Sequence, residues 1–121
     1  MNKIISVKNK CVQTKKIAGF NFSDESFSQL KEKAIGKKLM FSNSDRLEDW
    51  IGNIIEVTSD GFKIEVVNPK FEDIIYENML VNLDIQTLNN GNKIEEVISV
   101  NKIIIKPPNQ FDEVKVKKSE R

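Results

Sequence analysis

The sequence predicts an α+β fold that is mostly β, a bent antiparallel sheet or small β-barrel with one amphipathic helix at about residues 24–35. Apolar and polar residues alternate along several short segments, which is the period of a half-buried strand. The dipeptide Asp60-Gly61 lies between two such segments and is typical of a tight hairpin. One segment instead repeats its apolar residues at helical spacing, which predicts the helix.

The N-terminal segment predicts paired strands. Ile5 and Val7 alternate with polar residues over residues 3–8, which predicts a first strand. Residues 11–17 form a second candidate strand. We therefore expect the chain to open with a β-hairpin or meander.

The helix over residues 24–35 has recognisable ends. Ser23 is placed as its N-cap, and Asp24 and Glu25 follow in the first turn, where carboxylates favour the positive end of the helix dipole. Gly36 can take the left-handed conformation that ends a helix. One buried stripe is expected, formed by Phe27, Leu30, Ala34 and Ile35.

The central segment predicts a short strand and then a hairpin. Residues 39–41 are apolar and lead into a polar turn, where Ser44 can cap a single helical turn. Strands are expected over residues 52–58 and 62–67, with Asp60-Gly61 as the turn between them. Pro69 ends the second strand, and periodicity leaves residues 71–76 open between strand and helix.

The C-terminal segment predicts a second hairpin and a tail. Residues 79–87 alternate, a polar turn follows at residues 89–92, and a strand returns over residues 94–100. Residues 102–106 either continue that strand or form a last one. We assign residues 1–108 to one β-rich domain and residues 109–121 to a polar tail. That tail is either disordered or an arm that adds a strand to a neighbour.

The composition argues against an enzyme. The 121 residues include no histidine and one cysteine, which removes Ser-His and Cys-His pairs and multi-cysteine zinc sites. The glycines are isolated, so no phosphate-binding glycine motif is present. Asp45, Glu48 and Asp49 are close in sequence, but a solvated face explains them better than a cation site. We expect no catalytic residue, cofactor or metal, although a Ser-Lys arrangement stays open.

Charge is unevenly distributed along the chain. Residues 1–38 carry 9 basic and 3 acidic side chains, whereas residues 39–106 carry 6 basic and 12 acidic ones. This asymmetry can steer a partner or self-association, or it can be neutralised by strand pairing within the fold. The apolar runs are too short for a membrane span, and the N-terminus lacks the apolar core of a signal peptide. A cytoplasmic location is therefore expected.

Residues 19–67 resemble the N-terminal part of phage prohead proteases and related prohead proteins. The resemblance is carried by Gly-Phe-Asn-Phe-Ser, a helix, Gly36-Lys37-Lys38, a short strand, Ile-Gly-Asn-Ile-Ile and Asp-Gly-Phe-Lys-Ile-Glu. In that family the turn after the short strand bears the catalytic histidine, and here that turn reads Ser42-Asn43-Ser44. The resemblance thus implies a β-rich framework in a phage setting without the protease.

These observations predict a non-enzymatic phage or mobile-element protein that binds a protein partner stoichiometrically. It would act in particle assembly or as an antagonist of a host factor, and a homo-oligomer fits the same observations. The alternatives are sequestration of a small nucleotide-like ligand by lysines with Trp50 or Tyr76, and nucleic-acid binding by a basic edge. The candidate partner-binding residues are Lys15, Lys16, Trp50, Tyr76, Phe111, Val114 and Val116.

Overall fold

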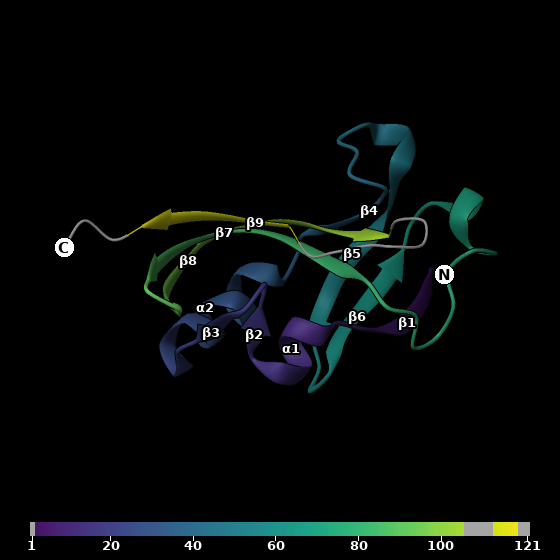
Figure 1. Ribbon diagram of the computed structural model, residues 1–121. Coiled ribbons are helices and arrows are strands. Elements are labelled where there is room, and N and C mark those ends of the chain that lie inside the picture. The colour runs from purple at the N-terminus through teal and green to yellow at the C-terminus, as the bar shows by residue number, and fades with distance from the viewer. Residues whose placement is uncertain (1, 106–112, 119–121) are drawn as a thin grey trace.

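The computed structural model describes residues 2–105 and 113–118, which form a nine-stranded mixed sheet accompanied by short helices (Figure 1). In the first half of the chain the elements are β1 (Lys3–Lys8), α1 (Lys10–Thr14), β2 (Lys16–Ile17), β3 (Phe20–Phe22), α2 (Asp24–Ala34), β4 (Lys38–Phe41), η1 (Leu47–Asp49) and β5 (Trp50–Val57). In the second half they are β6 (Gly61–Val66), η2 (Pro69–Phe71), β7 (Asn82–Asn90), β8 (Lys93–Ile105) and β9 (Glu113–Lys118).

Strand β8 organises the sheet. It pairs in parallel with β4 at one end and with β3 at the other, and it pairs antiparallel with β7 along most of its length. Beyond β4 the order continues through β5 and β6 to β1, and β9 lies on the far side of β7. The predicted α+β, mostly β fold with a bent sheet is confirmed. The sheet remains open and mixed, and β1 meets the segment before β7 at a single bridge between Lys8 and Leu80.

Regular bulges give β8 an unusual burial pattern. Residues 82–90 of β7 pair with residues 93–104 of β8, and the register shifts at three places. Each shift places an extra β8 residue opposite β7, which coils the strand. From Ile94 to Ile103 the buried apolar residues of β8 therefore recur every third position, at Ile94, Val97, Val100 and Ile103, and Ile104 is buried as well.

The strand predicted over residues 11–17 is wrong, because most of it is helix α1. Asn9 caps this helix: its Oδ1 accepts from the Val12 backbone N at 3.1 Å, and its Nδ2 donates to the Val81 carbonyl at 2.9 Å. Lys15 then ends the helix in a left-handed conformation with φ 56°. The buried Asn9 side chain thus hydrogen-bonds both the first turn of α1 and the residue that precedes β7. These contacts favour helix over strand here.

The predicted helix is confirmed as α2, with Phe27, Leu30 and Ala34 buried. The predicted place of Ile35 in the buried stripe is wrong, because the helix ends at Ala34 and Ile35 is extended and 48% exposed. Ser23 Oγ accepts from the Ser26 backbone N at 3.0 Å, and Gly36 beyond the helix has φ 83°, as its sequence position predicts. The helix packs against β8, where Gln29 Oε1 accepts from the Val97 backbone N at 2.9 Å. This contact gives a backbone donor of the bulged strand a partner from the helix.

The hairpin between β5 and β6 is confirmed, but its turn differs from the prediction. The Thr58 backbone N donates to the Gly61 carbonyl at 2.9 Å, so the turn residues are Ser59 and Asp60. Gly61 does not have a positive φ. A Cβ at this position would lie 1.9 Å from the carbonyl oxygen of Val7. Glycine is therefore required here by the close approach of β1.

Residues 71–76 are neither strand nor regular helix beyond the end of η2. Phe71 and Ile75 are buried and anchor this loop, and the Phe71 ring stacks on Phe41 with centroids 5.7 Å apart. The following Tyr76 side chain is 64% exposed. Tertiary packing of Phe71 and Ile75 holds this loop in place. For that reason the spacing of apolar residues alone could not assign the segment to a strand or a helix.

The C-terminal segment that the structure describes belongs to the same sheet. Strand β9 pairs in parallel with β7, and Val114 lies opposite Ile85 and packs against the core. The sequence predicted that the tail is either disordered or an arm that adds a strand to a neighbour. Over residues 113–118 the structure instead shows a strand that pairs within the same chain. The predicted boundary at residue 108 lies outside the described residues.

Candidate functional site: the loop between β4 and β5

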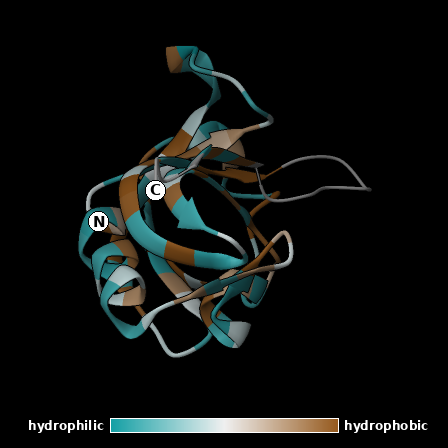
Figure 2. Cartoon of the chain, turned by 60° about the vertical axis from the view of Figure 1, so that its left-hand side comes forward, coloured by the Kyte–Doolittle hydropathy of each residue, from teal (hydrophilic) through white to brown (hydrophobic). Residues whose placement is uncertain are grey.

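Residues 42–49, here called the β4–β5 loop, stand out from the body of the molecule (Figures 1 and 2). The loop carries the short helix η1 at its outer end, where Figure 2 shows a hydrophobic tip. Leu47, in η1, is 74% exposed, more than any other large hydrophobic residue that the structure describes. The loop thus presents an apolar side chain to solvent.

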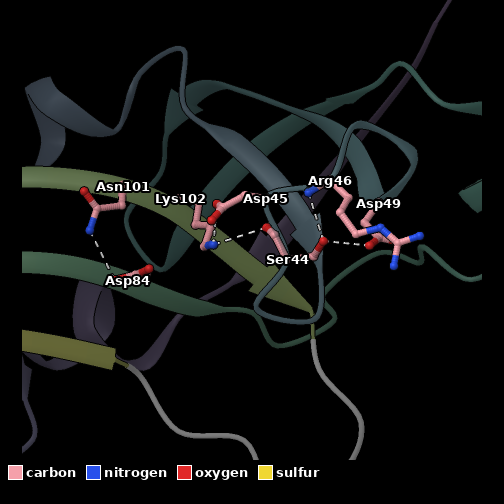
Figure 3. Close-up of polar contacts among 7 residues, drawn as sticks. All are labelled: Ser44, Asp45, Arg46, Asp49, Asp84, Asn101 and Lys102. Carbon is pink, nitrogen blue, oxygen red and sulfur yellow. Dashed lines mark hydrogen bonds and ion pairs between the residues drawn. The ribbon is translucent and has the colours of Figure 1, made fainter.

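Hydrogen bonds within the loop fix its shape (Figure 3). Ser44 Oγ donates to Asp49 Oδ2 at 2.6 Å and accepts from the Arg46 backbone N at 3.0 Å. The Asp49 backbone N donates to the Arg46 carbonyl at 3.0 Å, and Arg46 pairs with Glu48. Ser44 therefore orders the turn, although Arg46 takes the N-cap position that the sequence assigned to Ser44.

Lys102 of β8 ties the loop to the sheet. Its Nζ donates to Asp45 Oδ1 at 2.8 Å and to the Ser44 carbonyl at 3.1 Å. The Lys102 side chain is 9% exposed, whereas that of Asp45 is 92% exposed. The hydrogen bond from Lys102, and then its charge, lower the pKa of Asp45 below the ordinary value of 3.8, with a smaller contribution from the Lys115 charge.

A pocket of about 140 Å³ lies at the base of the loop. Half-buried Trp50 lines it, and the indole Nε1 donates to the Gly52 carbonyl at 3.0 Å and to Asn53 Oδ1 at 3.2 Å. The Lys38 amine lies 5.0 Å from the centre of the Trp50 ring. Besides Trp50, the lining residues are Lys38, Met40, Asp45, Arg46, Leu47, Asn101 and Lys102.

The acidic residues of this region do not converge. Asp45 binds Lys102, Glu48 binds Arg46, and Asp49 accepts from Ser44. Among residues 2–105 and 113–118, no group of His, Cys, Asp and Glu side chains has the arrangement of a metal site. Each carboxylate is thus accounted for by a local contact that orders the loop.

The predicted partner-binding residues lie on separate parts of the structure, and Trp50 alone among those described lines the pocket. Lys15 and Lys16 are exposed at the α1–β2 junction, and the Lys15 amine lies 5.3 Å from the centre of the Phe27 ring. Tyr76 is exposed after η2. On β9, Val114 is half-buried and Val116 is 37% exposed, while Phe111 lies outside the described residues.

Sequence reasoning missed Leu47 and Lys102. Leu47 is the only large aliphatic residue between Phe41 and Trp50, in a run otherwise rich in polar residues. Lys102 follows Asn101 and directly precedes the apolar run from Ile103 to Ile105. Both residues could have been noticed, because an apolar leucine is unusual in a polar loop and a lysine is unusual in a buried strand.

No protein-family model, curated protein or solved structure matches this chain. The resemblance to prohead proteins therefore stays a prediction. The turn that bears the catalytic histidine in that family corresponds here to residues 42–44, and it begins at Ser42, which has φ 59°. In the described part of the chain, no helix is long and apolar enough to cross a membrane.

Proposed function

We propose that this protein binds another protein stoichiometrically through the β4–β5 loop, with Leu47 as the anchor. The observation that carries the proposal is an exposed leucine at the tip of a loop that hydrogen bonds hold in one shape. An apolar side chain on a prominence can enter a pocket of a partner and be desolvated there, which is how a few residues dominate many interfaces.

The preordered loop supports this role energetically. Binding requires each mobile segment of an interface to lose conformational freedom, at about 0.5–1.5 kcal/mol for each flexible side chain. Hydrogen bonds of Ser44 within the β4–β5 loop and of Lys102 from β8 already fix the loop backbone around Leu47. Less entropy is therefore lost when a partner binds.

The loop also indicates the chemistry of the partner. Acidic Glu48 and Asp49 accompany basic Arg46 beside Leu47, so the rim of the interface carries both charges. A matching partner has an apolar cavity for Leu47 and a polar rim, as in interfaces that exclude water from a small centre.

The wider setting belongs to the same proposal. We place the protein in the cytoplasm of a phage-infected or phage-bearing bacterium, in particle assembly or in antagonism of a host factor. The support is the prohead-like order of residues 19–67 together with the absence of histidine from the sequence. These features favour binding over catalysis.

The test starts from a photo-crosslinking amino acid in place of Leu47, with the same substitution at Leu80 as control. Leu80 is also exposed, at 50%, but lies next to β1. A protein crosslinked from position 47 only is then purified, and calorimetry measures its binding to the wild type, Leu47→Ala and Leu80→Ala. We expect one-to-one binding that Leu47→Ala weakens about tenfold or more and Leu80→Ala leaves unchanged.

The contrary result is equally clear. If the purified partner binds Leu47→Ala as tightly as the wild type, or if position 80 crosslinks the same protein, the β4–β5 loop is not the binding surface. The thermal unfolding of Leu47→Ala serves as the folding control, because an exposed side chain should contribute within about 0.5 kcal/mol to stability.

A further inference from the structure

We propose that the pocket at the base of the β4–β5 loop, which Leu47 also lines, binds a small phosphate-like anion in addition to the protein partner proposed above. The pocket joins one buried lysine, two further cations and a tryptophan within a single hollow.

The charges that line the pocket favour an anion. Lys38 comes from β4, Arg46 from the loop and Lys102 from β8, while Asp45 is the only carboxylate in the lining. Asp45 is already bound to Lys102, and its carboxylate is 92% exposed to water. Arg46 is likewise paired with Glu48, so Lys38 is the lining cation that forms no ion pair within the described residues. An anion is attracted by Lys38 and by the N–H donors that remain on Arg46 and Lys102, whereas a cation would be repelled by all three side chains.

Lys102 supplies the most directed donor. An ammonium group has three N–H donors, and the hydrogen bonds to Asp45 and the Ser44 carbonyl use two of them. A third donor remains for a ligand in the pocket that Lys102 lines. The Lys102 side chain is 9% exposed, and such burial strengthens a charge-assisted hydrogen bond to an oxyanion.

The size of the pocket restricts the ligand. Its volume of about 140 Å³ is well below the roughly 300–1,000 Å³ of pockets that enclose a drug-sized molecule. A phosphate group or a small phosphate monoester therefore fits the hollow better than a complete nucleotide. For a nucleotide, the phosphate would enter and the nucleoside would remain outside.

Trp50 makes the proposal measurable, because it is the single tryptophan of the chain and lines the pocket. Its fluorescence is followed while inorganic phosphate is added to the full-length protein at constant ionic strength. We expect a saturable change with a dissociation constant of about 1 mM. Added sodium chloride should weaken it, since Lys38 and Arg46 are exposed to solvent.

Variants assign the binding to the pocket. Lys38→Gln and Arg46→Gln remove exposed charges and should each weaken phosphate binding about tenfold, and Lys102→Met should abolish saturation. Lys93→Gln removes an exposed lysine at the opposite end of β8 and should leave the dissociation constant unchanged. Circular dichroism confirms the fold of every variant.

Parallel titrations with acetate and adenosine monophosphate define the ligand. The proposal predicts weaker binding of acetate and a dissociation constant for the nucleotide similar to that of phosphate. A linear, non-saturating response of the wild type to phosphate would overturn it. Equal weakening by Lys93→Gln and Lys38→Gln would also overturn it, because general surface charge would then explain the response.

Discussion

At the scale of single residues, Lys102 links the sheet to the β4–β5 loop. Its side chain is nearly buried, while the side chain of its counter-ion Asp45 is almost fully exposed. Burying one charge is costly, and removing the partner of a buried charge costs more than replacing the charge itself with an apolar group. The two members of this pair should therefore respond differently to substitution.

We predict that Asp45→Ala lowers the melting temperature more than Lys102→Met does. The first change leaves the Lys102 amine without an ionic partner, and the second leaves Asp45 in contact with water. Thermal unfolding of both variants by circular dichroism measures the difference. A larger loss in Lys102→Met would contradict this description of the pair.

The lowered pKa of Asp45 also predicts a pH dependence. Because its folded pKa lies below 3.8, the ion pair stabilises the fold above that value and is lost as the pH falls through the folded pKa. Solvent exposure of Asp45 keeps the effect small. Between neutral pH and about pH 3, the wild type should lose slightly more stability than Asp45→Asn. Equal losses in thermal melts would contradict it.

Gly61 shows how a correct hairpin prediction can have the wrong cause. From the sequence, we expected Gly61 to be needed for the backbone conformation of the turn. In the structure it is needed because a Cβ there would collide with the carbonyl oxygen of Val7. Gly61→Ala should therefore destabilise the protein by at least about 2 kcal/mol, because a backbone atom has to move. Gly91→Ala, with φ 60° and no atom within 4 Å of the added Cβ, should cost only about 1 kcal/mol. Urea unfolding gives both values, and equal costs would contradict the packing explanation.

At the scale of elements, local contacts decided which parts of the fold the sequence could predict. Helix α2 was predictable because its cap, apolar stripe and terminal glycine all lie within residues 23–36. Helix α1 was missed because Asn9 also needs the carbonyl of Val81, far along the chain. The period-three burial of β8 arises from bulges against β7 and does not follow from the period of a regular strand.

The loop site was hidden from the sequence for the same reason. Lys102 and Asp45 are 57 positions apart, and nothing in either local sequence links them. Trp50 was recognised as a binding candidate on its residue type, but its partners in the pocket come from β4, the loop and β8. Convergence of three segments is a property of the topology alone.

Strand β9 supplies a test at the same scale. Val114 packs against the core and Val116 is partly exposed, although both lie on one strand. Val114→Ala should cost about 1 kcal/mol because it removes half-buried apolar surface. Val116→Ala should stay within about 0.5 kcal/mol. Denaturant unfolding measures both losses, and a loss for Val114→Ala no larger than that for Val116→Ala would contradict the packing of Val114 against the core.

At the scale of the whole molecule, strand pairing partly offsets the charge segregation along the chain. Basic β1 pairs with β6, and Lys8 forms an ion pair with Asp60 at 3.9 Å. On the neighbouring strand, Lys63 binds Glu56 at 3.1 Å. Both pairs are exposed and contribute little stability. The Lys8–Asp60 pair joins the basic segment to the acidic one, whereas the Lys63–Glu56 pair lies within the acidic segment.

The molecule as a whole is therefore a bent sheet from which one ordered loop projects (Figure 1). The binding role depends on that loop being held in its shape before any partner arrives. Nuclear magnetic relaxation of the backbone amide of Leu47 in the isolated protein measures this directly. We predict an order parameter of about 0.85, equal to that of the sheet, and a value below about 0.6 would contradict a preordered anchor.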